Sequence, residues 1–118
     1  MEYLLLIHSD DAKFAAMPEA TRTQAVAAYR AYTEALRGAG VLLGSNRLRP
    51  PSASTVVRVK GEKTEVHNGP FAETREALGG YYLIDVPDLD VAVSWAARCP
   101  GAAHGSMEVR PVWPMTEY

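Results

Sequence analysis

Tyr3-Leu4-Leu5-Leu6-Ile7 is the run that decides the fold of this 118-residue chain, and Tyr81-Tyr82-Leu83-Ile84-Asp85-Val86 has the same character later in the sequence. Each run is short for a helix and apolar at nearly every position, which is typical of a strand covered on both faces. An antiparallel strand with one face in water alternates apolar and polar residues instead. The two runs therefore predict the central strands of a sheet.

Two segments have helical periodicity. The first runs from Pro18, which suits a first helical position, to Ala39, and Gly40 suits the residue just past its end. Its predicted inner face consists of Ala25, Tyr29, Tyr32, Leu36 and Ala39. The second begins after Pro87, with Asp88 as its N-cap, and ends before Pro100-Gly101. Its predicted inner face consists of Leu89, Ala92, Ala96 and Cys99.

The remaining extended segments are more polar. Val41 to Leu48 predicts a strand that Pro50-Pro51-Ser52 ends. Thr55–Lys60 and Lys63–His67 flank Gly61-Glu62, which predicts a hairpin. Glu108 to Val112 alternates and contains a proline, as an edge strand does.

The order of these elements is strand, helix, strand, hairpin, strand, helix, strand. Apart from the inserted hairpin, this is the ferredoxin-like arrangement of two βαβ halves, an α+β fold with an antiparallel sheet. We expect one domain over residues 1–118. Two helices cover only one face of such a sheet, although both central strands are apolar on both faces. We therefore expect a homodimer whose open faces pack together around a cavity.

The charge balance and the cysteine count exclude several classes of protein. Twelve Lys+Arg face 14 Asp+Glu, a formal net charge of −2, whereas a dedicated nucleic-acid binder carries a basic excess. Cys99 is the only cysteine, which excludes an intrachain disulfide and a Cys-rich zinc site. No run approaches the ~20 apolar residues of a membrane span, and no signal peptide is recognisable, so we expect a cytoplasmic protein without membrane contact.

His8 is the candidate catalytic residue among the three histidines, because it ends the first predicted strand, where it can line a dimer cavity. Imidazole is suited to general acid–base chemistry near neutral pH. The alternative is a strand-end histidine hydrogen-bonded to a loop. Asp10 and Asp11 either orient His8 or form a turn or cap. His67 and His104 lack the spacing of a metal site, and we expect His104 to be exposed.

Arginines on predicted strands are the candidate anion ligands, because a guanidinium facing an apolar cavity binds a carboxylate or phosphate through two parallel hydrogen bonds. The alternative is ion pairing of Arg58 and Arg110 with Glu73 and Glu76. The strand arginines are Arg47, Arg49, Arg58 and Arg110.

The segment from residue 68 to residue 76, Asn-Gly-Pro-Phe-Ala-Glu-Thr-Arg-Glu, closely resembles the signature DGPFAETKE of the YCII-related (DGPF-domain) family. The resemblance continues into Leu78-Gly79-Gly80-Tyr81-Tyr82, the helix after Asp88, Val109-Arg110-Pro111 and the opening run, and so covers nearly the whole chain. It implies a ferredoxin-like fold assembled as a dimeric α+β barrel, in agreement with the homodimer expected from the uncovered face.

The chain also departs from that family. Where the signature begins with an acid this chain has Asn68, which cannot act as a general base, and Arg75 replaces a lysine. The shorter YCII branch is thought to use a histidine on the first helix with an aspartate late on the second. Tyr29 and Cys99 occupy those positions here, so the resemblance does not carry that dyad to this chain.

Two functions remain. The first is a cofactor-independent site for a small anionic molecule in the dimer cavity, binding or catalytic, with His8 as acid–base group and Arg49 or Arg58 as anion clamp. The other candidate ligand residues are Asn68, Phe71, Glu73 and Arg75. The alternative is a non-enzymatic regulatory module, because the resemblance implies association with sigma factors of the extracytoplasmic-function class. We expect no metal and no cofactor in either case. An apolar patch outside the dimer contact would favour the second function.

Overall fold

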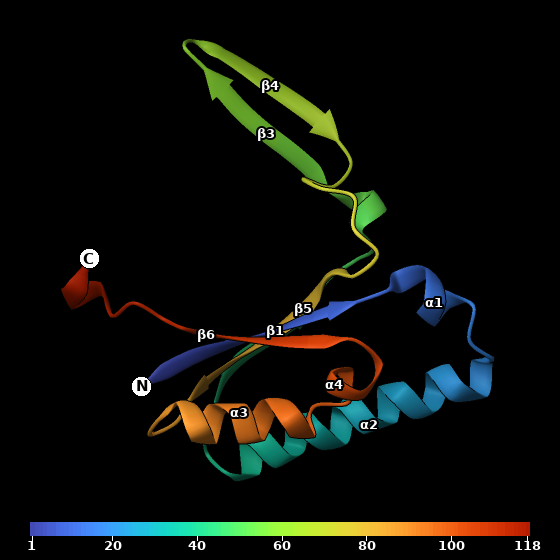
Figure 1. Cartoon of the computed structure of the whole chain (residues 1–118), viewed down its shortest axis with the longest axis vertical. Coiled ribbons are helices and arrows are strands. Elements are labelled where there is room, and N and C mark those ends of the chain that lie inside the picture. Colours follow the sequence, from blue (N-terminus) through green and yellow to red (C-terminus); the bar gives the residue numbers. More distant parts are fainter.

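The computed structural model describes residues 1–118 as a sheet with a layer of helices on one side and a hairpin standing apart on the other (Figure 1). The strands are β1 (Glu2–Ser9), β2 (Leu42–Arg47), β3 (Thr55–Lys60), β4 (Lys63–Asn68), β5 (Ala77–Asp85) and β6 (Ser106–Pro111). The α-helices are α1 (Asp11–Ala15), α2 (Glu19–Gly38), α3 (Leu89–Arg98) and α4 (Gly101–His104), and two short 3₁₀ helices are η1 (Pro51–Ala53) and η2 (Met115–Glu117).

The main sheet has four strands in the order β2-β5-β1-β6, and every neighbouring pair is antiparallel. Its two central strands, β1 and β5, are the two apolar runs, and β6 lies at an edge as its proline predicts. This is the predicted ferredoxin-like α+β topology. The inserted hairpin forms a separate two-stranded sheet, β3–β4, with the turn at Gly61.

Helix α2 lies where the sequence predicts it. It starts after Pro18, and Gly40 follows its end with φ 74°, a conformation that glycine adopts without strain. Tyr32 and Leu36 are buried against the sheet. Ala39 is exposed, contrary to the expected inner face, because it is the C-cap residue and lies beyond the last buried turn.

Helix α3 is also confirmed, with its cap. The Asp88 side chain accepts a hydrogen bond from the Val91 backbone N–H at 3.0 Å, which satisfies one of the unpaired donors of the first turn. Ala92 and Ala96 are buried, as is Cys99 directly after the helix. The prediction for Leu89 is wrong: this residue is 50% exposed, because it opens the first turn, where the chain has just left the sheet.

Two short helices, α1 and α4, were not predicted. The Asp10 side chain caps α1 by accepting from the Lys13 backbone N–H at 3.1 Å, which confirms the capping alternative for this residue. In α4, Gly101 is buried so tightly that a Cβ there would lie 2.7 Å from the Tyr29 hydroxyl oxygen. Glycine thus lets this single turn pack directly on α2 and β1.

The hydrophobic core lies between the sheet and the helices. Alternate residues of the central strands point into it: Tyr3, Leu5 and Ile7 from β1, and Tyr82 and Ile84 from β5, each at most 8% exposed. The helix side contributes Tyr32, Leu36, Ala92, Ala96 and Cys99. Burying each large aliphatic side chain stabilises the fold by roughly 1.5–3 kcal/mol before the loss of conformational entropy.

The opposite face of the same sheet carries no helix, because α2, α3 and α4 all lie on the core side (Figure 1). Leu4 and Leu6 of β1 and Leu83 of β5 point to this open face and are half-buried. The expected shortage of cover is therefore present in the single chain.

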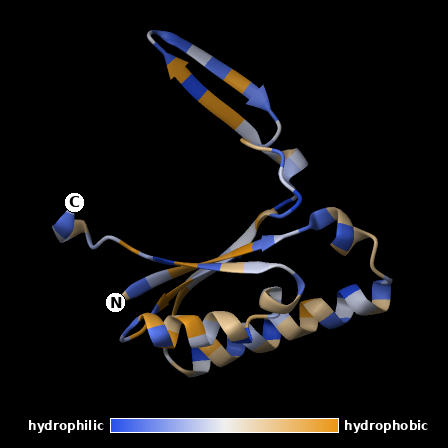
Figure 2. Ribbon diagram, viewed as in Figure 1, coloured by the Kyte–Doolittle hydropathy of each residue, from blue (hydrophilic) through white to orange (hydrophobic).

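The β3–β4 hairpin, which we call the arm, rises on the side of the sheet away from the helices (Figure 1). Val57 and Val59 of β3 and Val66 of β4 lie on one face of it, with Val57 opposite Val66, and each is 59–65% exposed. Figure 2 shows apolar segments on both strands of the arm. The arm contributes to a radius of gyration of 16.4 Å. A compact domain of this length has about 13.5 Å. A two-stranded ribbon is only marginally stable on its own in water.

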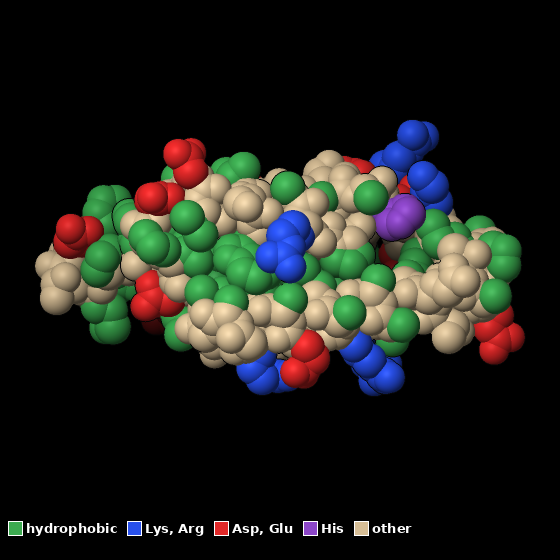
Figure 3. Space-filling model, turned by 90° about the horizontal axis from the view of Figure 1, so that it is seen from below, with side chains coloured by type: hydrophobic (Ala, Val, Ile, Leu, Met, Phe, Trp, Pro, Cys, Tyr) green, Lys and Arg blue, Asp and Glu red, His purple; other side chains and the backbone are tan.

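The outer side of the helical layer is different in character. Figure 3 looks onto the helices, where charged side chains of both signs are interspersed with small apolar ones. Such a mixed surface is ordinary for a solvated face. None of the helices is long and apolar enough to pass through a lipid bilayer.

Candidate functional site

The candidate site lies on the open face of the sheet, around the end of β1. Residues of one strand alternate between faces, so Leu4, Leu6 and His8 share the open face. On β6, Glu108 lies opposite Leu6 and Arg110 lies opposite Leu4. Polar and charged groups therefore border an apolar strip that the chain itself does not cover.

His8, Glu108 and Arg110 form a continuous hydrogen-bonded chain, which we call the His8 triad. His8 Nε2 lies 2.9 Å from Glu108 Oε1, and an Arg110 guanidinium nitrogen donates to Glu108 Oε2 at 2.7 Å. First the hydrogen bond from Arg110 and then that from His8 hold the pKa of Glu108 below its usual value. The carboxylate is thus ionised at neutral pH.

The ionised partner decides which nitrogen of His8 carries the proton. A carboxylate only accepts hydrogen bonds, so His8 Nε2 must be the donor in this pair. In the neutral imidazole, Nδ1 then holds the free lone pair. By accepting the hydrogen bond from Nε2, Glu108 orients the ring, the role that an acidic partner has beside many catalytic histidines.

The opposite edge of the open face has its own polar pair. The Asn46 side-chain nitrogen of β2 donates to the Tyr81 hydroxyl of β5 at 2.7 Å. Leu6 faces Tyr81 across the β1–β5 ladder, so the two polar edges border the same leucine. The open face thus has an apolar centre with hydrogen-bonding groups on both sides.

The predicted anion ligands lie elsewhere along the chain. Arg58, on the arm, is opposite Glu65, and its guanidinium lies 5.6 Å from the centroid of the Phe71 ring. Asn68 ends β4, and Glu73 is exposed in the segment that leads to β5. The structure brings Arg58 and Phe71 together, and their binding of a ligand stays a prediction.

Arg75 and Arg49 lie in other segments of the chain than Arg58 and Phe71. Arg75 borders a cavity of about 350 Å³ near the start of α1, together with Asp10 and Asp11. Arg49 is exposed in the segment between β2 and η1 and makes no ion pair within the chain. His8 is hydrogen-bonded to neither residue. His67 and His104 are both exposed, as expected for His104.

The expected ion pairs of Arg110 and Arg58 with Glu73 and Glu76 are wrong. Arg110 pairs with Glu108, two residues away on the same face of β6, while Glu76 accepts a hydrogen bond from Ser106 at 2.8 Å. Arg58 stacks on Phe71 instead of pairing with those glutamates. The physical reason is strand alternation, which places residues i and i+2 on one face within reach of each other.

On the core side, Tyr29 and Cys99 lie side by side, at the positions that the family resemblance assigns to a histidine and an aspartate. Burial, and then the neighbouring Cys99 thiol, raise the pKa of Tyr29, and burial raises the pKa of Cys99. Both groups are therefore neutral at physiological pH, and a neutral buried thiol is a poor nucleophile. This pair is suited to packing. No three His, Cys, Asp or Glu side chains cluster as a metal ion would need.

Sequence reasoning found His8 but missed Glu108 and Arg110 as its partners. The alternation of β6 does place these two residues on a common face. The β1–β6 register alone shows that this is the open face of the sheet and that Glu108 and Arg110 lie beside His8. A search for charged residues that alternate on an edge strand next to the first strand could have found the triad.

The four-stranded antiparallel sheet, the helices on one of its faces and the inserted hairpin define the class of this protein: a small ferredoxin-like α+β protein with one uncovered sheet face. A family model described as "YCII-related domain" matches residues 1–116. The chain belongs to this family. It is 37% identical over 118 residues to the uncharacterized protein R00369 of Rhizobium meliloti (strain 1021), in an alignment that covers 95% of this chain and 92% of that relative.

Proposed function

We propose that this YCII-related protein acts as a cytoplasmic homodimer, in which two open sheet faces enclose a cofactor-independent site for a small anionic molecule. The observation that carries the proposal is the His8 triad on an apolar face that no helix covers. Polar groups that border a strip of leucines are the usual composition of a ligand site. Enclosing that strip removes water and strengthens every electrostatic interaction within it.

The arm supports a second copy as the cover. It stands on the same side as the open face, and its exposed valines are apolar like Leu4 and Leu6. In a two-fold dimer the same patch meets itself, so one chain supplies both the open face and the arm to its partner. The His8 triad suits this arrangement because it contains charges of both signs, so that opposite charges of two facing copies attract each other.

The chemistry that the triad supports is proton transfer. His8 Nδ1 accepts a proton from a bound molecule, the ring becomes an imidazolium whose charge Glu108 balances, and the proton returns to another atom of the same molecule. Arg58 on the arm and Arg110 on the sheet are the cations that we expect to hold the anionic group.

The exposed valine face of the arm also favours a second candidate function. Val57, Val59 and Val66 form the apolar patch that a protein-interaction module needs, and a sigma factor is the partner that the family resemblance suggests. In that case the arm stays accessible when the chain is alone in solution.

The test starts from the oligomeric state, measured by light scattering for the wild type, Leu6→Asp and Val93→Asp. Val93 is the matched control, because it is 49% exposed on α3, on the side of the helices. We expect a dimer for the wild type and Val93→Asp, and a monomer for Leu6→Asp, because a carboxylate in the dimer contact would be buried without a partner. A monomeric wild type would overturn the proposal in favour of the interaction module.

A thermal-shift screen of small carboxylates and phosphates against the same variants and His8→Gln then tests the site. We expect a compound that stabilises the wild type and Val93→Asp, and whose effect is lost in Leu6→Asp and His8→Gln. A compound that stabilises all four proteins equally binds elsewhere, and if the screen yields only such compounds the proposed site is wrong.

A further inference from the structure

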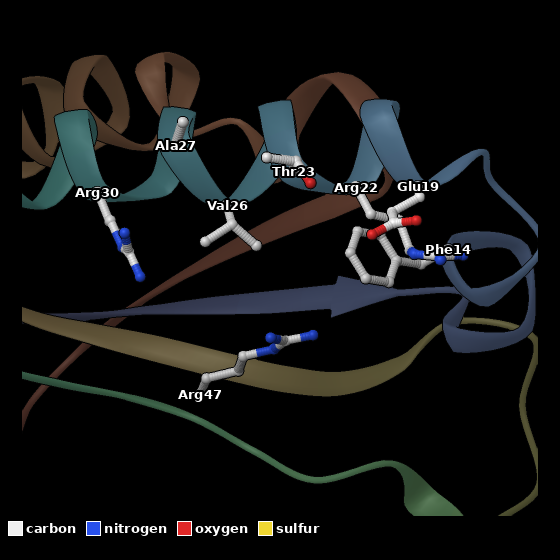
Figure 4. A pocket seen from close by; sticks show the side chains of 8 residues that line it. All are labelled: Phe14, Glu19, Arg22, Thr23, Val26, Ala27, Arg30 and Arg47. Carbon is white, nitrogen blue, oxygen red and sulfur yellow. The ribbon is translucent and has the colours of Figure 1, made fainter.

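A cavity of about 790 Å³ lies outside the open face, between the first two helices and the edge of the sheet. Figure 4 shows it between α2 and the strands, with side chains from α1, α2 and β2 along its walls. We call it the α2 groove. The proposed function does not use this groove.

The groove exists because α2 is longer than the sheet that it covers. The buried residues of α2, Tyr32 and Leu36, lie in its C-terminal half, whereas no residue of its first half is fully buried. That first half extends past the strands towards α1 (Figure 1), and its residues line the cavity. On the sheet, Arg47 is opposite Gly80, which contributes no side chain to fill the space.

Positive charge is in excess in the groove. Arg22, Arg30 and Arg47 line it, and Glu19 is the one acidic residue among the lining side chains. One terminal nitrogen of Arg22 donates to two backbone carbonyl oxygens, which fixes this side chain in place. Arg30 and Arg47 make no ion pair within the chain. Their guanidinium groups therefore have hydrogen-bond donors to offer an incoming anion.

The groove also has an apolar, partly aromatic wall. The guanidinium of Arg47 lies 5.7 Å from the centroid of the Phe14 ring, which holds the side chain extended along the groove. Val26 projects into the same space from α2 (Figure 4). A guanidinium supported by a ring leaves its donor edge free for the planar, two-point recognition of an acidic group.

We propose that the α2 groove binds a small aromatic anion, with its acidic group on Arg30 and Arg47 and its ring against Phe14 and Val26. Two cations without ion-pair partners select a carboxylate or a phosphate ester over a neutral molecule of the same shape. The apolar wall selects an aromatic acid over inorganic phosphate. This site is separate from the His8 triad, which lies on the other face of the sheet.

The experiment titrates 1-naphthoate, 1-naphthyl phosphate and neutral 1-naphthylmethanol into the ¹⁵N-labelled protein and follows backbone amide shifts. We expect both anions to shift the amides of Phe14, Val26 and Arg47 in a saturable manner and the alcohol to bind about tenfold more weakly or not at all. The tighter of the two anions identifies the acidic group as carboxylate or phosphate ester.

Three variants test which arginine side chains bind the anion. Arg30→Gln and Arg47→Gln should each weaken naphthoate binding by about tenfold, because each removes one charged partner of the anion. Arg37→Gln is the matched control: Arg37 is on the same helix but pairs with Glu34, away from the groove, and its loss should leave the affinity unchanged. Arg30 and Arg47 are both exposed, so neither variant should lose the fold.

Several results would overturn this proposal. One is that the alcohol binds as tightly as the anions, and another is that all three variants weaken naphthoate binding equally. The others are that the amide shifts centre on His8 and Glu108, or that no ligand binds in a saturable manner. Leu6→Asp separates this proposal from the proposed function, since a monomer that lacks the enclosed His8 site should still bind naphthoate in its groove with wild-type affinity. Loss of naphthoate binding in that variant would place the ligand in the dimer interface instead.

Discussion

The two faces of the four-stranded sheet belong to the same strands and have opposite chemistry. On the core face, Leu5 and Ile84 are fully buried, and the polar groups among them are neutral hydroxyls and a thiol. On the open face, Leu6 is half-buried, and the neighbouring polar groups are the charged members of the His8 triad. This chain's own helices cover one face, whereas the other face has no helical layer.

The hydrogen bonds of the two faces differ in the same sense. On the core face the Tyr32 hydroxyl donates to the Trp95 carbonyl oxygen at 2.7 Å, a partly buried bond between neutral groups that fixes α2 against α3. On the open face, Glu108 bridges two side chains that it does not bury. Bonds of the first kind hold a fold together, and an exposed charged pair adds little stability.

Leu5 and Leu6 are adjacent residues on opposite faces and allow the most direct test of the comparison. We expect Leu5→Ala to lower the free energy of unfolding by about 2–5 kcal/mol, because it leaves a cavity in a filled core. Leu6→Ala should cost about 1 kcal/mol in dilute protein, and the proposed dimer predicts a larger cost in concentrated protein. Urea unfolding at a high and a low protein concentration measures both.

The control for Leu6→Ala is how the stability loss of Leu5→Ala depends on protein concentration. The cost of Leu5→Ala should be the same at both concentrations, since the helices of its own chain cover Leu5. If Leu6→Ala shows no dependence on concentration, the open face has no cover in solution, and the proposed dimer interface is wrong.

The sequence was sufficient for the six strands and for helices α2 and α3, because these elements have local signals. Glycine at a positive φ ends α2, Asp88 caps α3, and two apolar runs mark the central strands. The same runs also predicted the open face, through a comparison of apolar strands with the number of helices available to cover them. Both inferences need only neighbours in sequence and the geometry of the sheet.

Sequence reasoning missed the short helices α1 and α4, and the contacts that it missed at the two candidate sites join residues that are distant in sequence. Glu108 meets His8 because of the β1–β6 register, and Arg47 reaches the α2 groove because α1 brings Phe14 beneath α2. The hairpin itself was predicted, but its separation from the main sheet was not. Its alternating valines are typical of a ribbon with one covered face. The pattern of the hairpin itself does not show whether another segment of the chain covers that face.

Alkaline pH should act mainly on the core face. Burial raises the pKa values of Tyr29, Tyr32 and Tyr82 above the ordinary value for a phenol, about 10. The folded chain therefore holds these protons at a pH where the unfolded chain releases them, and stability falls as the pH rises past about 10. Tyr29→Phe removes one of these protons, so its melting temperature should fall less than that of the wild type between pH 8 and about 11.

Differential scanning fluorimetry across this pH range, at constant protein concentration, makes the measurement. Tyr118 is 87% exposed, so Tyr118→Phe is the matched control and should follow the wild type. Identical alkaline profiles for Tyr29→Phe and the wild type would mean that the Tyr29 hydroxyl is not held in its protonated form by the core.

Acidic pH should act on the open face, with the smallest effect of the series. The hydrogen bonds from Arg110 and His8 hold the pKa of Glu108 below that of the unfolded chain, about 4.3. Its contribution is therefore present above that pH and lost as the pH falls through the lower folded value. Glu108→Gln lacks this contribution at every pH, so its stability should lie slightly below wild type at pH 7, and the difference should shrink as the pH falls through the folded value. Urea unfolding along a series of pH values from 7 downwards measures the difference. A difference that stays constant along the whole series would show that Glu108 acts by packing, and the two faces would then differ less in chemistry than their hydrogen bonds indicate.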